Sequence, residues 1–144
     1  MNHSEILSSF KHKANIQIRF KDIDKQGHVN NAVHLTYFET GRSSYFKKII
    51  GKNNWAESGI VLASTTIDYK RPILLEDELF CHTKIARLGA KSFDVEHILT
   101  IENGTTVELA AIGKSVMVCF NYKLNQTIAI PDSWEKVVRL FEKL

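Results

Sequence analysis

The feature that most constrains the fold is that the sequence contains one long helical pattern and several strand patterns. The single long helix must therefore pack against the sheet that these strands form. From Asn31 to Ile50 apolar or small residues recur on one helical stripe, formed by Leu35, Phe38, Gly41, Tyr45 and Ile49. Four strand-like segments follow, joined largely by short turns, at 60–69, 78–87, 92–101 and 105–120. Because short turns join antiparallel neighbours, we predict an α+β domain in which a curved antiparallel sheet packs against one long helix.

The ends of these segments carry matching turn and cap residues. Asn30 is placed to cap the long helix, and Gly51 lies where a left-handed C-terminal cap belongs. Gly41 costs up to about 1 kcal/mol inside a helix, so we expect it to let the helix approach the sheet closely. Asn103-Gly104 predicts a tight hairpin turn before the last long strand.

Patterns at the two ends of the chain predict two further elements. Before the long helix, Ile16, Ile18 and Phe20 alternate with polar residues, which predicts a half-buried strand. Near the C-terminus, Asp132 and Glu135 have the spacing of a capping box. They open a short helix whose apolar face is formed by Trp134, Val137, Val138 and Phe141. One helix covers one sheet face, so we expect dimerisation by edge pairing or helix packing.

Length and composition indicate one ordinary globular domain. The chain has 144 residues, which we interpret as a single domain over 1–144, with a core at about 15–122 and a C-terminal helix at about 132–143. The net charge of +3 is scattered, so no nucleic-acid partner is expected. No stretch resembles a signal peptide or a membrane span, and we expect a cytoplasmic protein without a membrane partner. Cys81 and Cys119 lie in apolar strand patterns without zinc spacing, so buried, reduced thiols and no metal site are expected.

The junction between the first strand and the long helix, "DIDKQGHVNN" from Asp22 to Asn31, carries more polar groups than a turn requires. Free N–H groups at a helix start carry partial positive charge and can stabilise an oxyanion. A nearby carboxylate can act as nucleophile or general base, so the junction holds the two elements that attack on a carbonyl needs. Asp, Gly and Asn are also the commonest turn residues, which leaves a purely structural role as the alternative.

Two stretches resemble the hotdog-fold acyl-CoA thioesterases, closest to the 4-hydroxybenzoyl-CoA thioesterase-like group. They are "RFKDIDKQGHVNNAVHLTYFETGR" and "TTIDYKRPILLEDELFCHTKIARLGAKSF". The resemblance extends from about Ile16 to Phe120 and implies a hotdog fold, a curved antiparallel sheet wrapped around the central helix. It also implies subunits paired edge to edge as a homodimer, often assembled into a homotetramer, with each active site at the subunit interface.

The resemblance implies roles for residues at the junction. Asp24 matches the catalytic carboxylate, which would attack the thioester or activate a water, and the Asn31 N–H would polarise the thioester carbonyl. His28 and Asn30 are second candidates, because some relatives with "HVNN" use these side chains. Asp22 is expected to fix the turn.

The resemblance also implies substrate contacts outside the junction. Glu39 corresponds to an orienting or second acid on the helix, with a solvated residue as the alternative. Ser64 and Thr65 would lie on a strand that, in the family, runs past the thioester from the partner chain, with a role as plain strand formers as the alternative. Arg87 and Lys91 would hold coenzyme A phosphates. The implied substrate is an acyl-CoA or acyl carrier protein thioester, with no cofactor beyond the coenzyme A of the substrate.

The resemblance leaves three chemistries to consider. The first is hydrolysis of an acyl-CoA thioester to the free acid and thiol. The second is a non-catalytic module that binds acyl-CoA, against which Asp24 argues. The third is hydration or dehydration of an acyl thioester, whose enzymes place their Asp and His differently. The acyl group itself is not defined by the sequence, because Tyr37, Phe38 and Tyr45 fit a core as well as a pocket.

Overall fold

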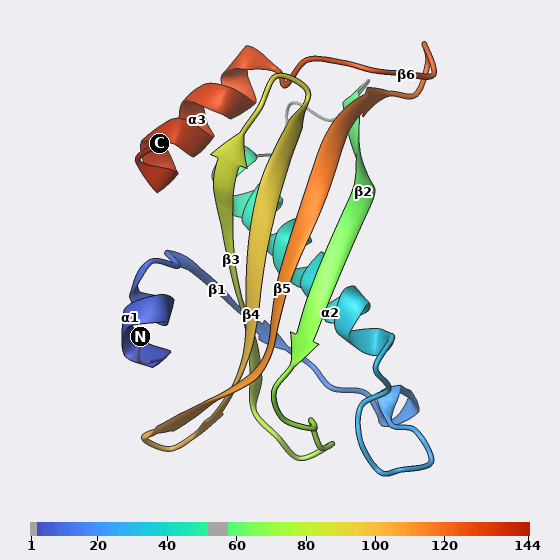
Figure 1. Ribbon diagram of the computed structural model, residues 1–144, viewed down its shortest axis with the longest axis vertical. Helices are drawn as coiled ribbons and strands as arrows, with labels where there is room; N and C mark the ends of the chain where they lie inside the picture. Colours follow the sequence, from blue (N-terminus) through green and yellow to red (C-terminus); the bar gives the residue numbers. More distant parts are fainter. Residues whose placement is uncertain (1–2, 52–57) are drawn as a thin grey trace.

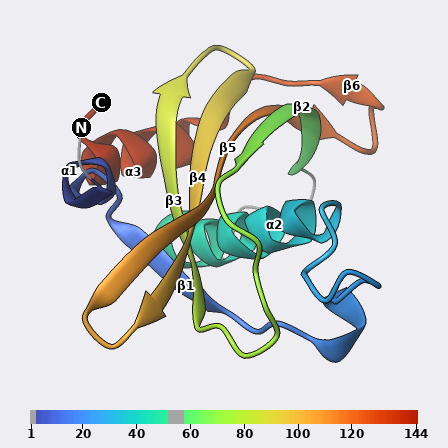
Figure 2. The same cartoon turned by 60° about the horizontal axis from the view of Figure 1, so that its bottom comes forward.

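The computed structural model describes residues 3–51 and 58–144. A strongly curved antiparallel sheet has the strand order β1-β3-β4-β5-β2, and β6 adds to β5. The elements are α1 (His3–Ser8), β1 (His12–Ile16), η1 (Phe20–Asp22), α2 (Val33–Tyr45), η2 (Phe46–Ile50), β2 (Ser58–Tyr69), β3 (Leu79–Leu88), β4 (Ser92–Asn103), β5 (Thr106–Asn121), β6 (Gln126–Thr127) and α3 (Asp132–Glu142). Figures 1 and 2 show α2 lying along one face of the sheet, so the predicted α+β architecture is confirmed.

The long helix begins and ends almost where the sequence predicts. Its α-helical part passes into a π-helical turn, η2, that ends at Ile50. Gly51 has a φ of 85° and donates its N–H to the Phe46 carbonyl over 3.0 Å, so a glycine at positive φ ends the helix as predicted, although its ψ of 171° lies outside the left-handed helical region. A Cβ at Gly41 would come within 2.5 Å of Cys81 Sγ, so the predicted close approach to the sheet is also confirmed.

The buried face of α2 is wider than the predicted stripe and differs from it at one end. Phe38, Gly41 and Tyr45 are buried as predicted, but Leu35 is 38 % exposed. The remaining members of the buried face are His34, Tyr37 and Arg42. The stripe prediction missed them because it followed apolar residues, whereas this helix turns polar and aromatic side chains toward the sheet.

Three local predictions are wrong by small shifts. The first strand ends at Ile16, and Phe20 lies in the 3-10 turn η1 with 83 % of its surface exposed. The tight turn after β4 is formed by residues 104–105, one position later than predicted, with Gly104 at a φ of 61°. No capping box opens α3, because its N-cap residue is Pro131.

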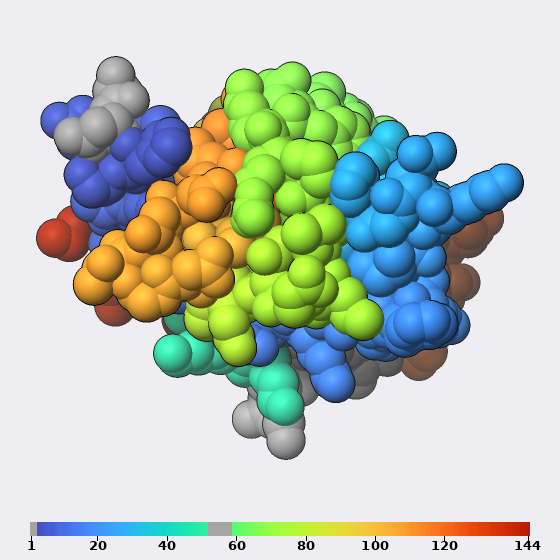
Figure 3. All heavy atoms as spheres, turned by 90° about the horizontal axis from the view of Figure 1, so that it is seen from below, coloured from blue at the N-terminus to red at the C-terminus, as the bar shows by residue number. Residues whose placement is uncertain are grey.

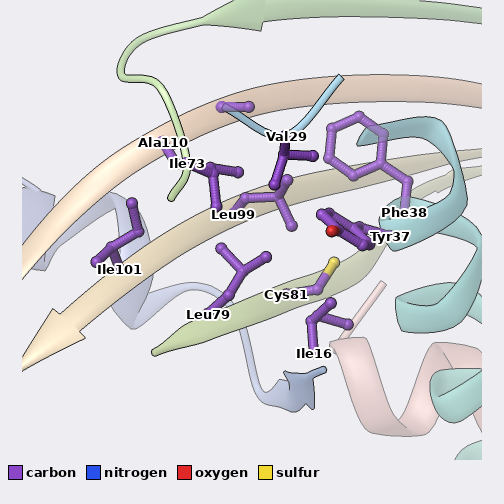
Figure 4. Packing of buried hydrophobic residues seen from close by; sticks show 11 residues of the cluster. Ile16, Val29, Tyr37, Phe38, Ile73, Leu79, Cys81, Leu99, Ile101 and Ala110 are labelled. Atoms are coloured by element: carbon purple, nitrogen blue, oxygen red, sulfur yellow. The ribbon is translucent and has the colours of Figure 1, made fainter. Parts of the chain in front are cut away.

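Two apolar clusters fill the space between the sheet and the helices. The first lies under the N-terminal half of α2 and includes Phe38, Leu79 and Leu99 (Figure 4). The second lies under Tyr45 and η2 and is closed by Trp134 of α3. Cys81 and Cys119 are buried free thiols, one in each cluster, as predicted.

The two outer edges of the sheet differ in how they are covered. β1 forms one edge and β2 the other, and Figure 1 shows the two short helices α1 and α3 on the side away from β2. Leu62 and Tyr69 of β2 are 46 % and 48 % exposed. In the described part of the chain, no strand pairs with the outer edge of β2. None of the described helices is long and apolar enough to cross a bilayer.

Candidate functional site

Asp22 is the buried anchor of the junction. It is 1 % exposed, and its carboxylate accepts hydrogen bonds from the Arg19 guanidinium at 3.0 and 3.2 Å, from the Arg19 N–H at 2.9 Å and from the Tyr37 hydroxyl at 2.8 Å. Burial alone would raise the pKa of Asp22, but these bonds outweigh it and hold the pKa below its ordinary value. Asp22 therefore fixes the chain where the sheet gives way to the helix, as predicted.

Asp24 opens a tight turn that projects from the same junction. Its N–H donates to the His28 carbonyl over 2.9 Å, and the Gly27 N–H donates to the Asp24 carbonyl over 3.0 Å. One carboxylate oxygen accepts the Gln26 N–H over 2.9 Å. The other carboxylate oxygen has no hydrogen-bond partner in the described part of the chain. Asp24 is thus held by its backbone and by one oxygen, while the second oxygen stays available for chemistry.

The start of α2 lies directly behind this turn. The Asn30 N–H donates to the Asp22 carbonyl over 2.9 Å, and the Asn30 side chain accepts the Ala32 N–H over 2.9 Å. Asn30 therefore stabilises the turn before the helix, but the predicted cap position is wrong, because the N-cap residue is Ala32, which has no side-chain cap hydrogen bond. The Asn31 carbonyl accepts the Tyr69 hydroxyl over 2.8 Å, whereas the Asn31 N–H meets no acceptor among residues 3–51 and 58–144. The end of β2 thus positions a helix-start N–H that points to no protein group.

His28 and Asn31 line a small cavity beside the turn. The cavity has a volume of about 210 Å³, and its wall also includes His34 and Tyr69. The rings of His34 and Tyr69 meet edge to face at 4.8 Å. Burial lowers the pKa of His34, and its hydrogen bonds to the backbone at Asn30 and Asn31 only partly counter this effect. Figure 3 shows the junction, in blue, protruding next to the green segment that follows β2, so the turn is open to solvent.

A second, larger cavity lies at the other end of α2. Its volume is about 510 Å³, and it lies between the helix and the strand pair β2–β5. Its wall is formed by Glu39, Arg42, Ser43, Phe46, Lys47, Gly51, Ile60, Leu62 and Met117. Glu39 is the predicted helix acid, and the structure places it in this cavity on an exposed part of α2. Arg42 was missed from the sequence, although it lies four residues after Phe38 and three before Tyr45, a spacing that places it on the same, buried face of the helix.

The structure separates the two predicted strand residues. Thr65 lies opposite Ser115, to which its hydroxyl is hydrogen-bonded at 3.1 Å, and Ser115 is buried. Ser64 is opposite Val116 and exposed. Because side chains alternate along a strand, Ser64 and Thr65 lie on opposite faces of β2. Only Thr65 faces the side of the sheet on which α2 packs.

Arg87 and Lys91 lie at the end of the molecule opposite the junction. Figure 1 shows the β3–β4 turn at the top and the junction at the bottom of the sheet. Arg87 forms a two-pronged ion pair with Asp94 at 3.0 and 3.1 Å, and Lys91 is exposed in the turn. Within one chain, the predicted phosphate-binding residues are therefore not brought to Asp24.

No group of three or more metal-ligating side chains converges within residues 3–51 and 58–144. The site consists of an accessible carboxylate, an unpaired helix-start N–H and two cavities. This set is typical of chemistry on a carbonyl group, in which a base or nucleophile faces an oxyanion-binding N–H.

Comparison with known proteins decides the family. A model of the thioesterase-like superfamily matches residues 18–138, which include the junction, α2, strands β2 to β6 and most of α3. The chain belongs to this superfamily. A solved thioesterase from Thermus thermophilus, complexed with coenzyme A and Zn, is 35 % identical with a TM-score of 0.81. The match covers 94 % of this chain and 97 % of that one, so the predicted hotdog fold is confirmed.

Two curated proteins are also similar over most of their length. The long-chain acyl-CoA thioesterase FadM of Escherichia coli (strain K12) is 29 % identical over 122 residues, which are 80 % of this chain and 87 % of FadM. The uncharacterized protein YsmA of Bacillus subtilis (strain 168) is 32 % identical over 98 residues, which are 68 % of this chain and 67 % of YsmA. The relatives of this chain thus include an acyl-CoA thioesterase of the same domain size.

Proposed function

We propose that this protein hydrolyses acyl-CoA thioesters to a free carboxylic acid and coenzyme A, with Asp24 as the reacting carboxylate. The observation that carries the proposal is the contrast between the two aspartates of one junction. Asp22 is buried and its carboxylate is fully hydrogen-bonded, whereas Asp24 keeps one oxygen without a partner in the described part of the chain. The long-chain acyl-CoA thioesterase among the relatives and the coenzyme A bound to a similar thioesterase support this substrate class.

The chemistry follows from the positions of the two groups. The Asn31 N–H donates to the thioester oxygen and stabilises the negative charge that develops there. Asp24 either attacks the carbonyl carbon or takes a proton from a water that does, and in both routes the sulfur leaves as the coenzyme A thiolate, which takes up a proton to give the thiol. In the first route the C–S bond breaks as a mixed anhydride forms on Asp24, and water then hydrolyses the anhydride to the free acid and regenerates the carboxylate. An acyl carrier protein thioester fits the same steps, because the reacting atoms are identical. His28 remains a candidate for the proton transfer to the leaving group.

A dimer formed through the open edge of β2 brings the separated groups together. Antiparallel pairing of β2 with a second copy sets the Tyr69 end of one strand beside the Gly59 end of the other. Asp24 and Asn31 lie at the Tyr69 end, and the larger cavity lies at the end that contains Ile60. In this dimer the junction of one chain faces the larger cavity and the β3–β4 turn of the partner subunit.

The test is the release of free thiol from a panel of acyl-CoAs of different length, including aromatic acyl groups. We expect Asp24→Asn to lower kcat/KM by about a hundredfold or more while the far-UV circular dichroism stays unchanged. Asp22→Asn is the control variant, because it removes the other carboxylate of the junction. It shows how much activity is lost when the junction is destabilised rather than when the reacting group is removed. Full activity in a folded Asp24→Asn variant contradicts the assignment of Asp24.

The alternative is a binding module that holds acyl-CoA without cleaving it. It predicts that acyl-CoA raises the melting temperature of the wild type while no thiol is released from any acyl-CoA or acyl carrier protein thioester. A hydratase would instead add or remove water across the acyl double bond and leave the thioester intact, which the change in absorbance of an enoyl-CoA reports.

A further inference from the structure

His34 contacts the peptide group that carries the unpaired N–H at the start of α2. It lies in the first turn of the helix and is 3 % exposed. Its Nδ1 lies 3.3 Å from the Asn30 carbonyl oxygen. Because a carbonyl oxygen only accepts, Nδ1 carries the proton and donates it in this bond. The Asn30 carbonyl and the Asn31 N–H belong to one planar peptide group, so His34 binds the end of that group opposite the N–H.

The position of the His34 ring follows from the helix and from β2. A side chain in a helix leans toward the N-terminus and lies over the residue four positions earlier, which for His34 is Asn30. On its other side the ring meets Tyr69 edge to face at 4.8 Å. The Tyr69 hydroxyl in turn donates to the Asn31 carbonyl over 2.8 Å. The ring is therefore held between the start of α2 and the end of β2, and its Nδ1 is kept toward the Asn30 carbonyl.

The bond from His34 changes the donor strength of the peptide group that it contacts. The Asn30 carbonyl also accepts the Val33 N–H over 2.9 Å. Donors on a carbonyl oxygen draw electron density from the peptide nitrogen, because the C–N bond has partial double-bond character. The N–H at the other end becomes a stronger donor, by about 10 to 30 % for each such bond. Within residues 3–51 and 58–144 no acceptor uses the strengthened Asn31 N–H.

We propose that His34 is a positioning residue that orients and strengthens the Asn31 N–H as the donor to the thioester oxygen. This proposal rests on the proposed thioesterase function and adds a residue to its oxyanion site. His34 acts through the peptide group and not on the reacting atoms. The negative charge on the thioester oxygen is largest in the transition state, so the effect of His34 is on kcat rather than on KM.

Two substitutions separate the hydrogen bond from the packing of the ring. His34→Asn places an amide N–H close to the position of Nδ1 but removes the ring, whereas His34→Phe keeps a ring against Tyr69 but removes the donor. We expect His34→Phe to lower kcat about three- to tenfold with a nearly unchanged KM, and His34→Asn to retain most of kcat.

The melting temperatures of the two variants should follow the opposite order. His34→Asn loses the buried ring and should melt at a lower temperature than His34→Phe. If His34 were only structural, kcat would decrease with stability, and His34→Asn would be the less active variant. That order of kcat values, or an equal kcat in the wild type and both variants, overturns the proposal.

Thr40→Val is the matched control. The Thr40 hydroxyl donates to the Thr36 carbonyl over 3.0 Å, which is also a bond from a side chain of α2 to the carbonyl four residues earlier. It is exposed and does not involve the junction, so kcat and KM should stay at the wild-type values. A loss of kcat equal to that of His34→Phe would mean that any weakening of the helix lowers activity, and it would overturn the proposal.

Nuclear magnetic resonance measures the peptide group without a substrate. The amide nitrogen resonance of Asn31 and the carbonyl carbon resonance of Asn30 both respond to hydrogen bonds at the Asn30 oxygen. We expect both to move upfield in His34→Phe and to stay close to the wild-type positions in His34→Asn and Thr40→Val. Unmoved resonances in His34→Phe overturn the role of His34, and the thioesterase function stands if thiol is still released. The expected shifts without release of thiol from any thioester overturn the proposed function and, with it, the effect of His34 on catalysis.

Discussion

The two ends of α2 differ in whether the buried charged side chain found there is paired with other protein groups. At the N-terminal end, Asp22 is enclosed by Arg19 and Tyr37, and its backbone carbonyl accepts the Asn30 N–H. At the C-terminal end, Arg42 faces a cavity without an acceptor in the described part of the chain. The difference indicates a division of labour along one helix. Under the proposed function, the N-terminal, closed end holds the reacting groups in position, while the C-terminal, open end borders a cavity.

The closed end still leaves two groups unsatisfied within the described residues, and both face away from the core. They are one oxygen of Asp24 and the Asn31 N–H. Because the surrounding polar groups are bonded, these two are held without a large entropic cost of ordering at the moment of reaction. Under the proposed function, this rigidity keeps the Asp24 oxygen and the Asn31 N–H in place for the substrate.

The largest expected effect tests the rigidity of the closed end. Asp22→Asn removes a buried carboxylate that accepts bonds from Arg19 and Tyr37, and we expect it to lower the free energy of unfolding by about 2 to 4 kcal/mol. Urea unfolding measures this loss. Asp24→Asn should change the same free energy by about 0.5 kcal/mol or less, because its side chain makes one exposed contact. An equal loss of unfolding free energy in the two variants would contradict the interpretation that Asp22 anchors the junction and Asp24 does not.

A second prediction concerns the buried ring beneath the middle of α2. His97 is fully buried and stacks on Phe38 at 4.6 Å, and burial, with a smaller contribution from the charge of Arg42, lowers its pKa from 6.5 to about 3. Between these values the unfolded chain binds a proton that the folded chain excludes. The free energy of unfolding should therefore fall with decreasing pH, by up to about 1.4 kcal/mol per pH unit for this group.

Replacement of the ring checks this pH dependence. His97→Phe keeps the stack on Phe38, and it should reduce the slope of unfolding free energy against pH by about one proton below about pH 6. Urea unfolding at a series of pH values measures the slope. Burial also lowers the pKa of His82, to about 4, so part of the acid sensitivity should remain in the variant. A slope identical to that of the wild type would show that His97 is protonated in the folded state.

The smallest expected effect concerns the contact between β2 and the helix start. Tyr69→Phe removes the hydrogen bond to the Asn31 carbonyl, which we expect to cost about 1 kcal/mol of unfolding free energy. It should also lower kcat more than it raises KM, since Asn31 stays present but is less well oriented. Steady-state kinetics with the best substrate give the two constants. An unchanged kcat would mean that the hydrogen bond from Tyr69 is not needed to orient Asn31.

The sequence predicts the sheet and the closed end well because their signals are local. Strand patterns, Gly51 and the polar junction depend on neighbours a few residues away, and Asp22 was correctly interpreted as a turn anchor. The contact of Asp22 with Tyr37 spans fifteen positions, and no periodicity indicates it. The role of Asp24 and its neighbours in catalysis stays a prediction until the variants are measured.

The buried face of α2 was harder to predict than its ends, because charge is normally assigned to the outer face of a helix. Arg42 and His34 are buried against that expectation, and Leu35 is exposed against it. Phe20 was predicted to lie in a strand because apolar and polar residues alternate there. The hydrogen bonds between Arg19 and Asp22 turn the chain at this point, and the alternation gives no sign of them. The buried face can be identified only in the structure, where the close approach of Gly41 to Cys81 and Thr83 fixes the rotation of the helix about its own axis.

The outer edge of β2, which no strand in the described part of the chain covers, has a consequence for a newly made chain. Its backbone donors and acceptors form a template that does not discriminate between strands, so any unfolded segment nearby can attach to it. The risk is greatest when identical chains are scarce and other nascent proteins are abundant. We therefore expect weak expression or strong dilution to increase misassociation of this protein more than that of a protein whose sheet has no free edge. Its dependence on chaperones should decrease as its own concentration rises.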